Sequence, residues 1–279
     1  MKTNYYITGD CHGCFTKFAN IKLEQDEKGI VICLGDFSIN YYLNKTDTRA
    51  KKELSQNYPN LTFYCLRGNH EQRPQLIDNM LLAYDKNVWG EVYYEEAYPN
   101  IKYFKDYGFY KIQGYLCLVI GGAYSIDKYW RLARAGLTEE TNIPKKTGWF
   151  ENEQLTKAEM NDCLDDIDFW NRQGIDVDFI LTHTCPKSFQ PIDMFLKTVD
   201  QSTVDDTMEK FLDKVNYSIS WKYWLFGHYH DNRLERPHVE MYYNDIEEID
   251  NIVARWDRYD KTGELDWWLK KSPNFDKEI

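Results

Sequence analysis

The sequence predicts an α/β protein built on a mainly parallel β-sheet, followed by an antiparallel section. Three observations support this prediction. The first 85 residues alternate three times between a short apolar run and a helix-like stretch. Residues 30–34 form a continuous apolar run, which is typical of a strand buried on both faces of a sheet. Residues 90–120 contain short apolar runs separated by turn residues, as antiparallel strands do.

The N-terminal third contains the three predicted strand–helix units. Strands are expected at three apolar runs, residues 4–8, 30–34 and 61–66. Helices are expected in the stretches that follow them, residues 15–23, 46–58 and 72–84. Because the carboxyl ends of parallel strands meet at one edge of a sheet, we expect functional side chains to gather there.

The remaining elements are less regular in pattern. The sequences around Gly108 and Gly114 predict hairpin turns in the antiparallel section. Residues 125–152 lack a clear period and are expected to form an irregular excursion over the surface. Thr156 and Glu159 have the spacing of a capping box, which predicts the start of a helix. Further expected elements are strands at 178–182 and 221–226, helices at 193–198 and 203–215, and strands within 239–268.

Composition indicates a globular protein, and we expect one domain over residues 1–279, because 43% of the residues are apolar and no linker interrupts them. The formal net charge of −11 argues against broad binding to nucleic acid or anionic membranes, so nucleic acid is expected only as a possible substrate. No stretch approaches the roughly 20 apolar residues of a membrane span, and no signal-peptide region precedes the first strand. Seven cysteines, an odd number, predict reduced thiols in a cytosolic protein. Oligomeric state is not predicted.

Five polar clusters follow five of the predicted strands. They are Gly9-Asp10-Cys11-His12-Gly13, Gly35-Asp36, Gly68-Asn69-His70-Glu71, Thr182-His183 and Gly227-His228-Tyr229-His230. These clusters provide seven potential metal ligands: Asp10, His12, Asp36, Asn69, His183, His228 and His230. Imidazole, carboxylate and amide groups together suit Mn²⁺, Fe or Zn²⁺ better than Ca²⁺ or Mg²⁺. Seven ligands exceed the needs of one tetrahedral ion, so we expect two divalent ions that share a carboxylate.

The order and content of these clusters resemble the five motifs of the calcineurin-like metallophosphoesterase superfamily, over residues 9–230. The resemblance implies a four-layer αββα fold, in which two β-sheets form a sandwich flanked by helices, and a dinuclear centre with manganese favoured and iron or zinc as alternatives. By motif position, the first metal would be bound by Asp10, His12, Asp36 and His230. The second would be bound by Asp36, Asn69, His183 and His228. The implied reaction is hydrolysis of a phosphate ester by a metal-bound hydroxide, and Asn69 would also contact the substrate.

The resemblance implies further roles near the third motif. His70 would be the catalytic residue that protonates the leaving oxygen or stabilises the transition state. Arg67 precedes this motif, as in the protein-phosphatase branch of the family, where it would bind phosphate oxygens. At the second motif, Asn40 stands where that branch has another arginine, which argues against a Ser/Thr protein phosphatase. Arg131 or Arg134 are candidates to replace it.

Several alternatives remain open at this point. Because of Arg67, a phosphomonoesterase is favoured over a phosphodiesterase or nuclease that would use the same site. The alternative of another class is a non-catalytic metal-binding scaffold, although all ligand positions are filled. Cys11 and Cys14 form a C-x-x-C pair, but without a second pair or a following histidine they are interpreted as bystanders. His238 is expected to be solvated in a loop.

Overall fold

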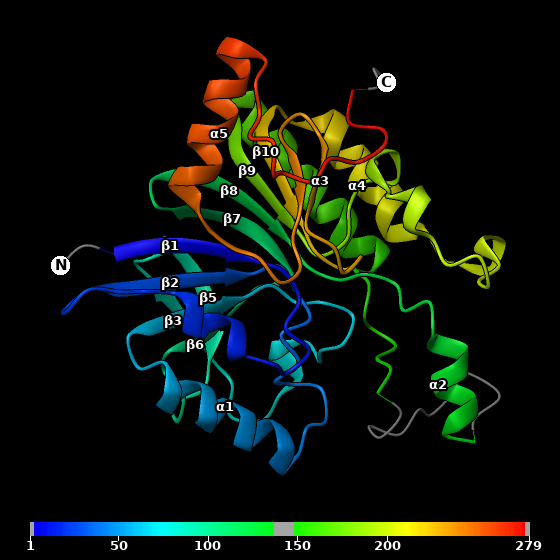
Figure 1. Ribbon diagram of the computed structural model, residues 1–279. Helices are drawn as coiled ribbons and strands as arrows, with labels where there is room; N and C mark the ends of the chain where they lie inside the picture. Colours follow the sequence, from blue (N-terminus) through cyan, green and yellow to red (C-terminus); the bar gives the residue numbers. More distant parts are fainter. Residues whose placement is uncertain (1–2, 137–147, 277–279) are drawn as a thin grey trace.

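The computed structural model describes residues 3–136 and 148–276. Two mixed β-sheets pack face to face, and helices cover their outer faces (Figure 1). The predicted α/β sandwich is therefore confirmed. Part of the excursion expected at 125–152 lies outside the described residues, because residues 137–147 are not described.

The first sheet has seven strands in the order β13-β1-β2-β3-β6-β5-β4. Its central strands run parallel and are β1 (Thr3–Thr8), β2 (Lys28–Cys33), β3 (Leu61–Cys65) and β6 (Ile101–Phe104). The strands added antiparallel at its two sides are β4 (Leu81–Asp85), β5 (Gly90–Tyr94) and β13 (Ile246–Glu248). The carboxyl ends of β1, β2 and β3 consequently lie next to one another.

The second sheet has six strands in the order β11-β12-β10-β9-β8-β7. Its parallel strands are β8 (Tyr115–Ile120), β9 (Val177–Thr182), β10 (Trp221–Phe226) and β12 (Val239–Met241). Its antiparallel edges are β7 (Tyr107–Ile112) and β11 (Arg233–Arg236). Gln113 and Gly114 join β7 to β8 with positive φ angles of 52° and 91°, which confirms the hairpin predicted there.

Successive residues of the central strands enter different hydrophobic layers. Tyr223 and Leu225 of β10 pack between the two sheets, whereas Trp224 and Phe226 pack against helices on the outer face. This follows from the pleat of a strand, which points alternate side chains to opposite faces. Both faces are buried, and this is why the sequence of such a strand is an uninterrupted apolar run.

The helices occupy distinct positions around the sandwich (Figure 1). Helix α1 (Lys45–Asn57) packs Leu54 against the outer face of the first sheet. Helices α3 (Lys157–Arg172) and α4 (Thr207–Ser218) cover the outer face of the second. Helix α5 (Ile249–Thr262) inserts Trp256 into the layer between the sheets, and the short α2 (Lys128–Arg134) extends from the body. Among the described helices, none has the length and apolar character needed to cross a membrane.

The capping box at the start of α3 is confirmed. Thr156 accepts a hydrogen bond from the backbone of Glu159, and the Glu159 carboxylate accepts one from the backbone of Thr156. These two bonds satisfy donors that a helix start otherwise leaves unpaired.

Several predicted elements differ in the structure. The helix expected at 72–84 is only a 3₁₀ turn at Pro74–Leu76 followed by strand β4, because proline disfavours helix in the residue before it and the later apolar residues pair with β5. The sequence around Gly108 forms no hairpin, because β6 and β7 belong to different sheets. The predicted helices at 15–23 and 193–198 are reduced to the 3₁₀ turns Thr16–Asn20 and Ile192–Met194.

The C-terminal region was expected to be all strand and is mainly helix. Ile249, Ile252 and Trp256 are spaced by three and four residues, so one face of α5 is apolar and packs between the sheets. Gly263 ends this helix in the left-handed conformation with φ of 69°. The helical period was present in the sequence and was masked by the aromatic residues that also favour strands.

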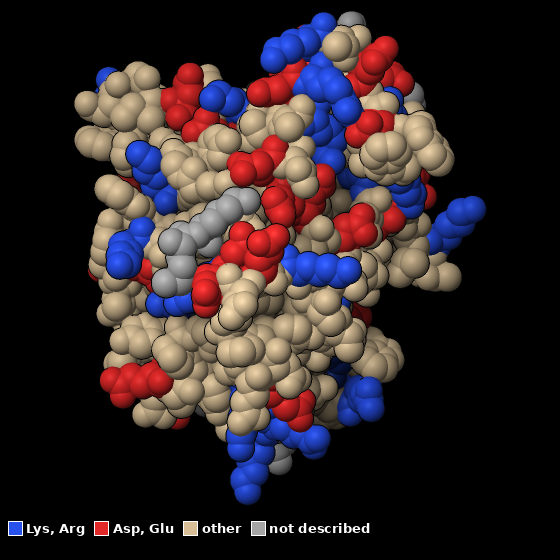
Figure 2. Space-filling view, turned by 60° about the vertical axis from the view of Figure 1, so that its left-hand side comes forward, with Lys and Arg blue, Asp and Glu red and all other residues tan. Residues whose placement is uncertain are grey.

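Charged side chains of both signs are interspersed on the face seen in Figure 2. The described residues on this face form no continuous basic surface of the kind that binds polynucleotides through their phosphates. This agrees with the formal net charge of −11. Recognition of an anionic ligand must therefore depend on a local site.

The layer between the sheets supports the loops that follow the strands. A substitution at Leu225 tests how much this packing contributes to stability. This residue is fully buried there, three positions before His228. We expect Leu225→Ala to lower the free energy of unfolding by about 2–5 kcal/mol, because it leaves a cavity in a packed layer. Urea denaturation followed by circular dichroism measures the change. The control Leu82→Ala, at a position 45% exposed, should change it by less than about 0.5 kcal/mol; equal effects would contradict the packing.

Candidate metal centre

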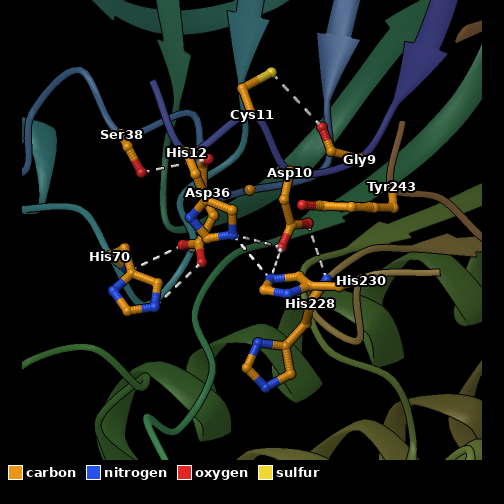
Figure 3. A network of polar contacts seen from close by, with 12 residues as sticks. Gly9, Asp10, Cys11, His12, Asp36, Ser38, His70, His228, His230 and Tyr243 are labelled. Atoms are coloured by element: carbon orange, nitrogen blue, oxygen red, sulfur yellow. Dashed lines mark hydrogen bonds and ion pairs between the residues drawn. The ribbon is translucent and has the colours of Figure 1, made fainter. Parts of the chain in front are cut away.

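The five polar clusters meet where central strands of both sheets end. The loop after β1 is joined to the loop after β2 by backbone hydrogen bonds from His12 N to Asp36 O (2.8 Å) and from Cys11 N to the same oxygen (3.0 Å). In the second sheet, Gly227 N donates to His183 O at 2.9 Å. His228 N donates to Asp10 Oδ1 at 3.0 Å and links the loops of the two sheets, and Figure 3 shows Asp10, His12 and His230 close together.

The first group of side chains consists of Asp10, His12 and His230. Their ligand atoms all lie within 4.8 Å of one another. Asp10 Oδ2 lies 3.2 Å from His230 Nε2 and 3.6 Å from His12 Nε2, and the two histidine nitrogens are 2.8 Å apart. The Tyr243 ring stacks on His230 at 4.9 Å and fixes the plane of that imidazole. Residues more than 200 positions apart in the sequence thus present three donor atoms to one point.

The second group centres on Asp36 and His183. A carboxylate oxygen of Asp10 and one of Asp36 lie within 4.8 Å of each other and of a His183 nitrogen. Asp36 Oδ1 is 3.5 Å from His183 Nε2, and Asn69 Oδ1 is 3.0 Å from that nitrogen. The His228 ring lies 5.0 Å from the His183 ring, and its backbone N–H donates to Asp10 Oδ1 at 3.0 Å. The two groups are therefore adjacent and linked by the carboxylates.

The hydrogen bonds around these atoms fit a cation. His183 Nδ1 is 2.7 Å from Leu34 O and donates to it, which leaves a lone pair on Nε2. Asn69 donates through Nδ2 to Ser125 Oγ at 2.9 Å, so its Oδ1 faces that lone pair. Asp10 Oδ2 is buried and has no hydrogen-bond partner among the described residues. With Nε2 unprotonated, these electron-rich atoms would face one another with no proton between them, an arrangement that a metal ion stabilises.

Backbone conformation at the loops is strained. Four of the seven predicted ligands have positive φ: His12 at 47°, Asp36 at 47°, His228 at 70° and His230 at 56°. Such angles are uncommon for residues other than glycine and cost free energy that the surrounding structure must supply. The left-handed turn reverses each chain just after its strand, and this directs the side chain back to the centre.

Two glycines are required by close packing at the ligands. A Cβ on Gly68 would lie 2.0 Å from Asp36 Oδ1, and one on Gly227 would lie 2.5 Å from Asp10 Oδ1. Both distances are far shorter than a non-bonded contact. The glycine of one motif thus makes room for the carboxylate of another, which explains why glycine neighbours the ligand residues.

The environment keeps both carboxylates ionised. Burial alone would raise the pKa of Asp10 and Asp36, but the surrounding histidines outweigh it and hold both values below the usual range. Burial would likewise lower the pKa of His183, yet the charge of Asp36 raises it to about 9, so His183 holds a proton that a bound cation would displace. Burial and the charge of His183 lower the pKa of His228 to about 3, which keeps this imidazole neutral. Ionised carboxylates and neutral imidazole are the forms that bind metal.

Some supporting residues were missed by the sequence analysis. Lys17 donates through Nζ to the carbonyl oxygens of Gly9, Asp10 and Tyr243 at 2.8–3.1 Å, which ties the loop after β1 to a distant segment. Ser125 orients Asn69 and is itself held by Glu153. No local pattern marks Lys17 or Ser125, because their partners lie up to 226 positions away.

Arg67 is not where the prediction placed it. Its side chain is 2% exposed, pairs through Nε with Asp106 and donates through Nη1 to Glu153 O at 2.7 Å. It does not line the cavity at the centre. Arg67 is thus a buried ion-pair partner that joins the loop after β3 to the segment before α3, outside the cavity lining where its phosphate contact was predicted.

Arg131 lines the cavity instead. Its Nη2 lies 3.5 Å from His70 Nε2, and its Nη1 donates to the Tyr41 hydroxyl at 2.5 Å. Asp127 holds the other side of the guanidinium at 2.8 Å. Of the two arginines considered as replacements, Arg134 is exposed and lies against Trp130. Only Arg131 brings its positive charge next to the predicted catalytic histidine.

His70 lies beside the second group of ligands. Its backbone N–H donates to Asp36 Oδ1 at 2.9 Å, and its Nε2 is 3.7 Å from Asp36 Oδ2. Burial lowers the pKa of His70, Asp36 opposes that effect, and Arg131 adds to it. The imidazole faces the cavity, where it can contact a bound molecule.

A cavity of about 940 Å³ opens at the centre. Among its lining residues, Tyr41 and Arg131 contact His70, and Tyr229 contacts His228. Figure 3 shows His70 and His228 on different sides of the Asp36 carboxylate, and we call the lining on these two sides the His70 arm and the His228 arm. The His70 arm is lined by Tyr41, Tyr42, Asp47, Ala50, Ile126 and Arg131. The His228 arm is lined by Gln190, Met194, Phe195, Val204, Glu209 and Tyr229. The space far exceeds a phosphate group, so it can hold a substrate with organic substituents.

Two expectations outside the centre have different outcomes. All seven cysteines are free thiols, and Cys11 Sγ lies 3.9 Å from Cys33 Sγ rather than forming a unit with the exposed Cys14. His238 was expected to be solvated, but its ring stacks on Trp256 at 4.8 Å and pairs with Asp260. It does not line the cavity, so it is no part of the centre.

The fold and the polar centre agree with sequence comparison. The calcineurin-like phosphoesterase family matches residues 3–232, so the chain belongs to that family. The family implies divalent metal ions, which the grouped Asp and His side chains can hold. No curated protein shows significant sequence similarity to the chain.

Two solved structures are similar to the chain at low identity. The sulfate thiohydrolase SoxB of Thermus thermophilus is 12% identical with a TM-score of 0.36, and the match covers 87% of this chain and 51% of SoxB. The NAD nucleotidase NadN of Haemophilus influenzae is 11% identical with a TM-score of 0.35, and the match covers 83% of this chain and 39% of NadN. The chain thus spans about half of the first protein and less of the second.

Metal content tests the ligand set. We expect Asp36→Asn and His228→Ala to lose most of the bound metal, because Asp36 belongs to the group with Asp10 and His183, and the His228 ring lies 5.0 Å from that of His183. Elemental analysis of purified protein after dialysis against Mn²⁺ measures the loss. The matched control is His238→Ala, which removes a histidine outside the cavity and should retain the wild-type metal content. Full metal content in Asp36→Asn would remove Asp36 from the set.

Proposed function

We propose that the protein hydrolyses phosphate esters with the help of two divalent cations, manganese being favoured. The observation that carries this proposal is the convergence of two groups of donor atoms linked by buried carboxylates. One cation would be held by Asp10, His12, Asp36 and His230. The other would be held by Asp36, Asn69, His183 and His228, so Asp36 would contribute to both. The membership of the family supports this reaction class.

The charge balance favours an anionic substrate. Two divalent cations bring four positive charges, and the carboxylates of Asp10 and Asp36 return two. Such cations activate water and neutralise charge on phosphoryl oxygens. In the overall reaction a water oxygen forms a bond to phosphorus, the ester P–O bond breaks, and the departing oxygen gains a proton.

His70 and Arg131 are proposed to act on the substrate. His70 Nε2 faces the cavity beside Asp36 and is positioned to give a proton to the departing oxygen. Arg131 extends its guanidinium next to His70, where it would hold a phosphoryl oxygen in the role first predicted for Arg67. Tyr41 and Asp127 fix the guanidinium in place.

The cavity supports a phosphodiester as the preferred substrate. The preference for a monoester depended on Arg67, which is buried in an ion pair with Asp106. A monoester has one organic substituent, whereas a diester has two, and the cavity is lined by side chains of both the His70 arm and the His228 arm. A monoester remains the second candidate. It carries one more negative charge than a diester, and the positive charge of Arg131 would attract that charge.

Two chromogenic esters test this preference. With Mn²⁺ present, we expect kcat/KM for bis(p-nitrophenyl) phosphate to exceed that for p-nitrophenyl phosphate by at least about tenfold, because only the diester places a second substituent next to His228. Release of p-nitrophenolate measures both rates. The Asp36→Asn protein is the control for background hydrolysis. A higher value for the monoester would reverse the preference, and hydrolysis of neither ester nor of any phosphate ester in a wider panel would contradict the proposed reaction.

The role of His70 is tested with leaving groups of different basicity. We expect His70→Ala to slow hydrolysis of a dinucleoside monophosphate, which expels an alkoxide, by about 10²–10⁴-fold. Hydrolysis of bis(p-nitrophenyl) phosphate should be slowed much less, because p-nitrophenolate departs without a proton. The metal content of the variant, measured in parallel, should equal that of wild type. Equal losses on both substrates would exclude proton donation, and loss of metal would make His70 a ligand.

A further inference from the structure

The His228 arm contains a buried acidic group whose hydrogen bonds are incomplete. Glu209, in the first turn of α4, is 4% exposed and lines the cavity. Its Oε1 accepts a hydrogen bond from Thr184 Oγ1 at 2.8 Å, whereas Oε2 has no hydrogen-bond partner among the described residues. A buried carboxyl oxygen without a partner destabilises the fold. A ligand in the arm that carries an N–H or O–H group would remove this cost.

Further polar atoms lie next to Glu209. The Tyr229 hydroxyl is 3.2 Å from Thr184 Oγ1, and Gln190 Nε2 is 3.4 Å from the same hydroxyl. The side chains of Glu209, Gln190 and Tyr229 all line the arm. This end of the cavity therefore offers both hydrogen-bond donors and acceptors, and such groups can recognise the edge of a polar ring.

Two aromatic rings contribute to the apolar part of the arm. The rings of Phe195 and Tyr229 are nearly parallel, with an interplanar angle of 11° and centroids 6.4 Å apart. Phe195 is half-buried, and Met194 and Val204 line the same arm. Parallel aromatic faces bind planar aromatic groups by stacking, and they do so with little dependence on the identity of the ring.

The distance from the centre limits what reaches this surface. The Tyr229 ring lies 5.0 Å from that of His228, and among the ring contacts of the described residues the Phe195 ring packs on Tyr229 rather than on His228. A ring joined directly to the ester oxygen, as in a phenyl phosphate, would stay near His228. A ring that stacks on Phe195 must be connected to phosphorus through a spacer, as a nucleobase is connected through its sugar.

The position of His70 indicates whether the departing or the retained substituent of a diester occupies the His228 arm. In the proposed reaction His70 gives a proton to the departing oxygen, and it lies at the start of the other arm with Tyr41 and Arg131. The departing group of a diester therefore leaves along the His70 arm. The substituent in the His228 arm remains attached to phosphorus in the product.

We propose that the His228 arm binds the retained substituent of a phosphodiester, a planar nitrogen heterocycle on a sugar-like spacer, by stacking on Phe195 and hydrogen bonding to Glu209 and Gln190. This proposal rests on the proposed function. The reaction would then convert a nucleoside phosphodiester and water into a nucleoside monophosphate and an alcohol.

A pair of diesters with the same leaving group tests the arm. Thymidine 5′-(p-nitrophenyl) phosphate and methyl p-nitrophenyl phosphate both release p-nitrophenol, but only the first carries a ring with an N–H group. We expect Phe195→Ala to raise KM for the thymidine ester about tenfold relative to that for the methyl ester. Glu209→Gln should raise the same ratio severalfold. Tyr217→Ala, which removes a ring 75% exposed and outside the cavity, is the matched control and should leave the ratio unchanged.

Equilibrium binding gives a readout that does not depend on turnover. Calorimetric titration with thymidine 5′-phosphate should show binding to the wild-type protein and to Tyr217→Ala, and about tenfold weaker binding to Phe195→Ala. If both diesters are hydrolysed with the same KM ratio in wild type and Phe195→Ala, the arm proposal is overturned while the proposed function stands. If neither is hydrolysed but thymidine 5′-phosphate binds through Phe195, the reaction is wrong and the arm is supported.

Discussion

The constraint on which the rest of the structure depends is the burial of two carboxylates, Asp10 and Asp36, at the point where the two sheets meet. Both side chains are 1% exposed or less. Removing a charge from water costs several kcal/mol unless partners surround it. The partners here are histidines from loops of both sheets, so the sandwich must bring the carboxyl ends of five strands together before these charges can be accommodated.

The same constraint explains the strained backbone. Four predicted ligands adopt positive φ, and Gly68 and Gly227 leave no room for a Cβ beside the carboxylates of Asp36 and Asp10. Residues in such conformations reduce stability and persist only where the surroundings hold them. The rigid layers on both sides of each central strand, fully buried at Leu225 and Trp224, provide that support. Packing in the core and geometry at the centre are therefore parts of one arrangement.

Arg67 and Arg131 show how tertiary contacts change the meaning of a motif. Arg67 occupies a family position, yet it pairs with Asp106 beneath the surface. Arg131, from a region without a clear sequence pattern, reaches His70 through contacts with Tyr41 and Asp127. The positive charge near the centre is thus supplied by a different segment. Because Arg131 of α2 lines the His70 arm, that segment also helps to shape the cavity.

The sequence by itself determined the parallel strands, the capping box of α3 and the residues that converge on the centre, because each follows from a local pattern or from a polar cluster placed after a strand. It did not determine α5 or β4, because the aromatic and apolar residues there fit the period of a helix and that of a strand. Pairing with β5 made β4 a strand, and packing between the sheets made α5 a helix. Only the tertiary structure decided that Arg67 pairs with Asp106 and which residues line the two arms. Phe195, Glu209 and Tyr229 lie on separate segments, and sequence patterns report neighbours along the chain, whereas a cavity depends on contacts between distant ones.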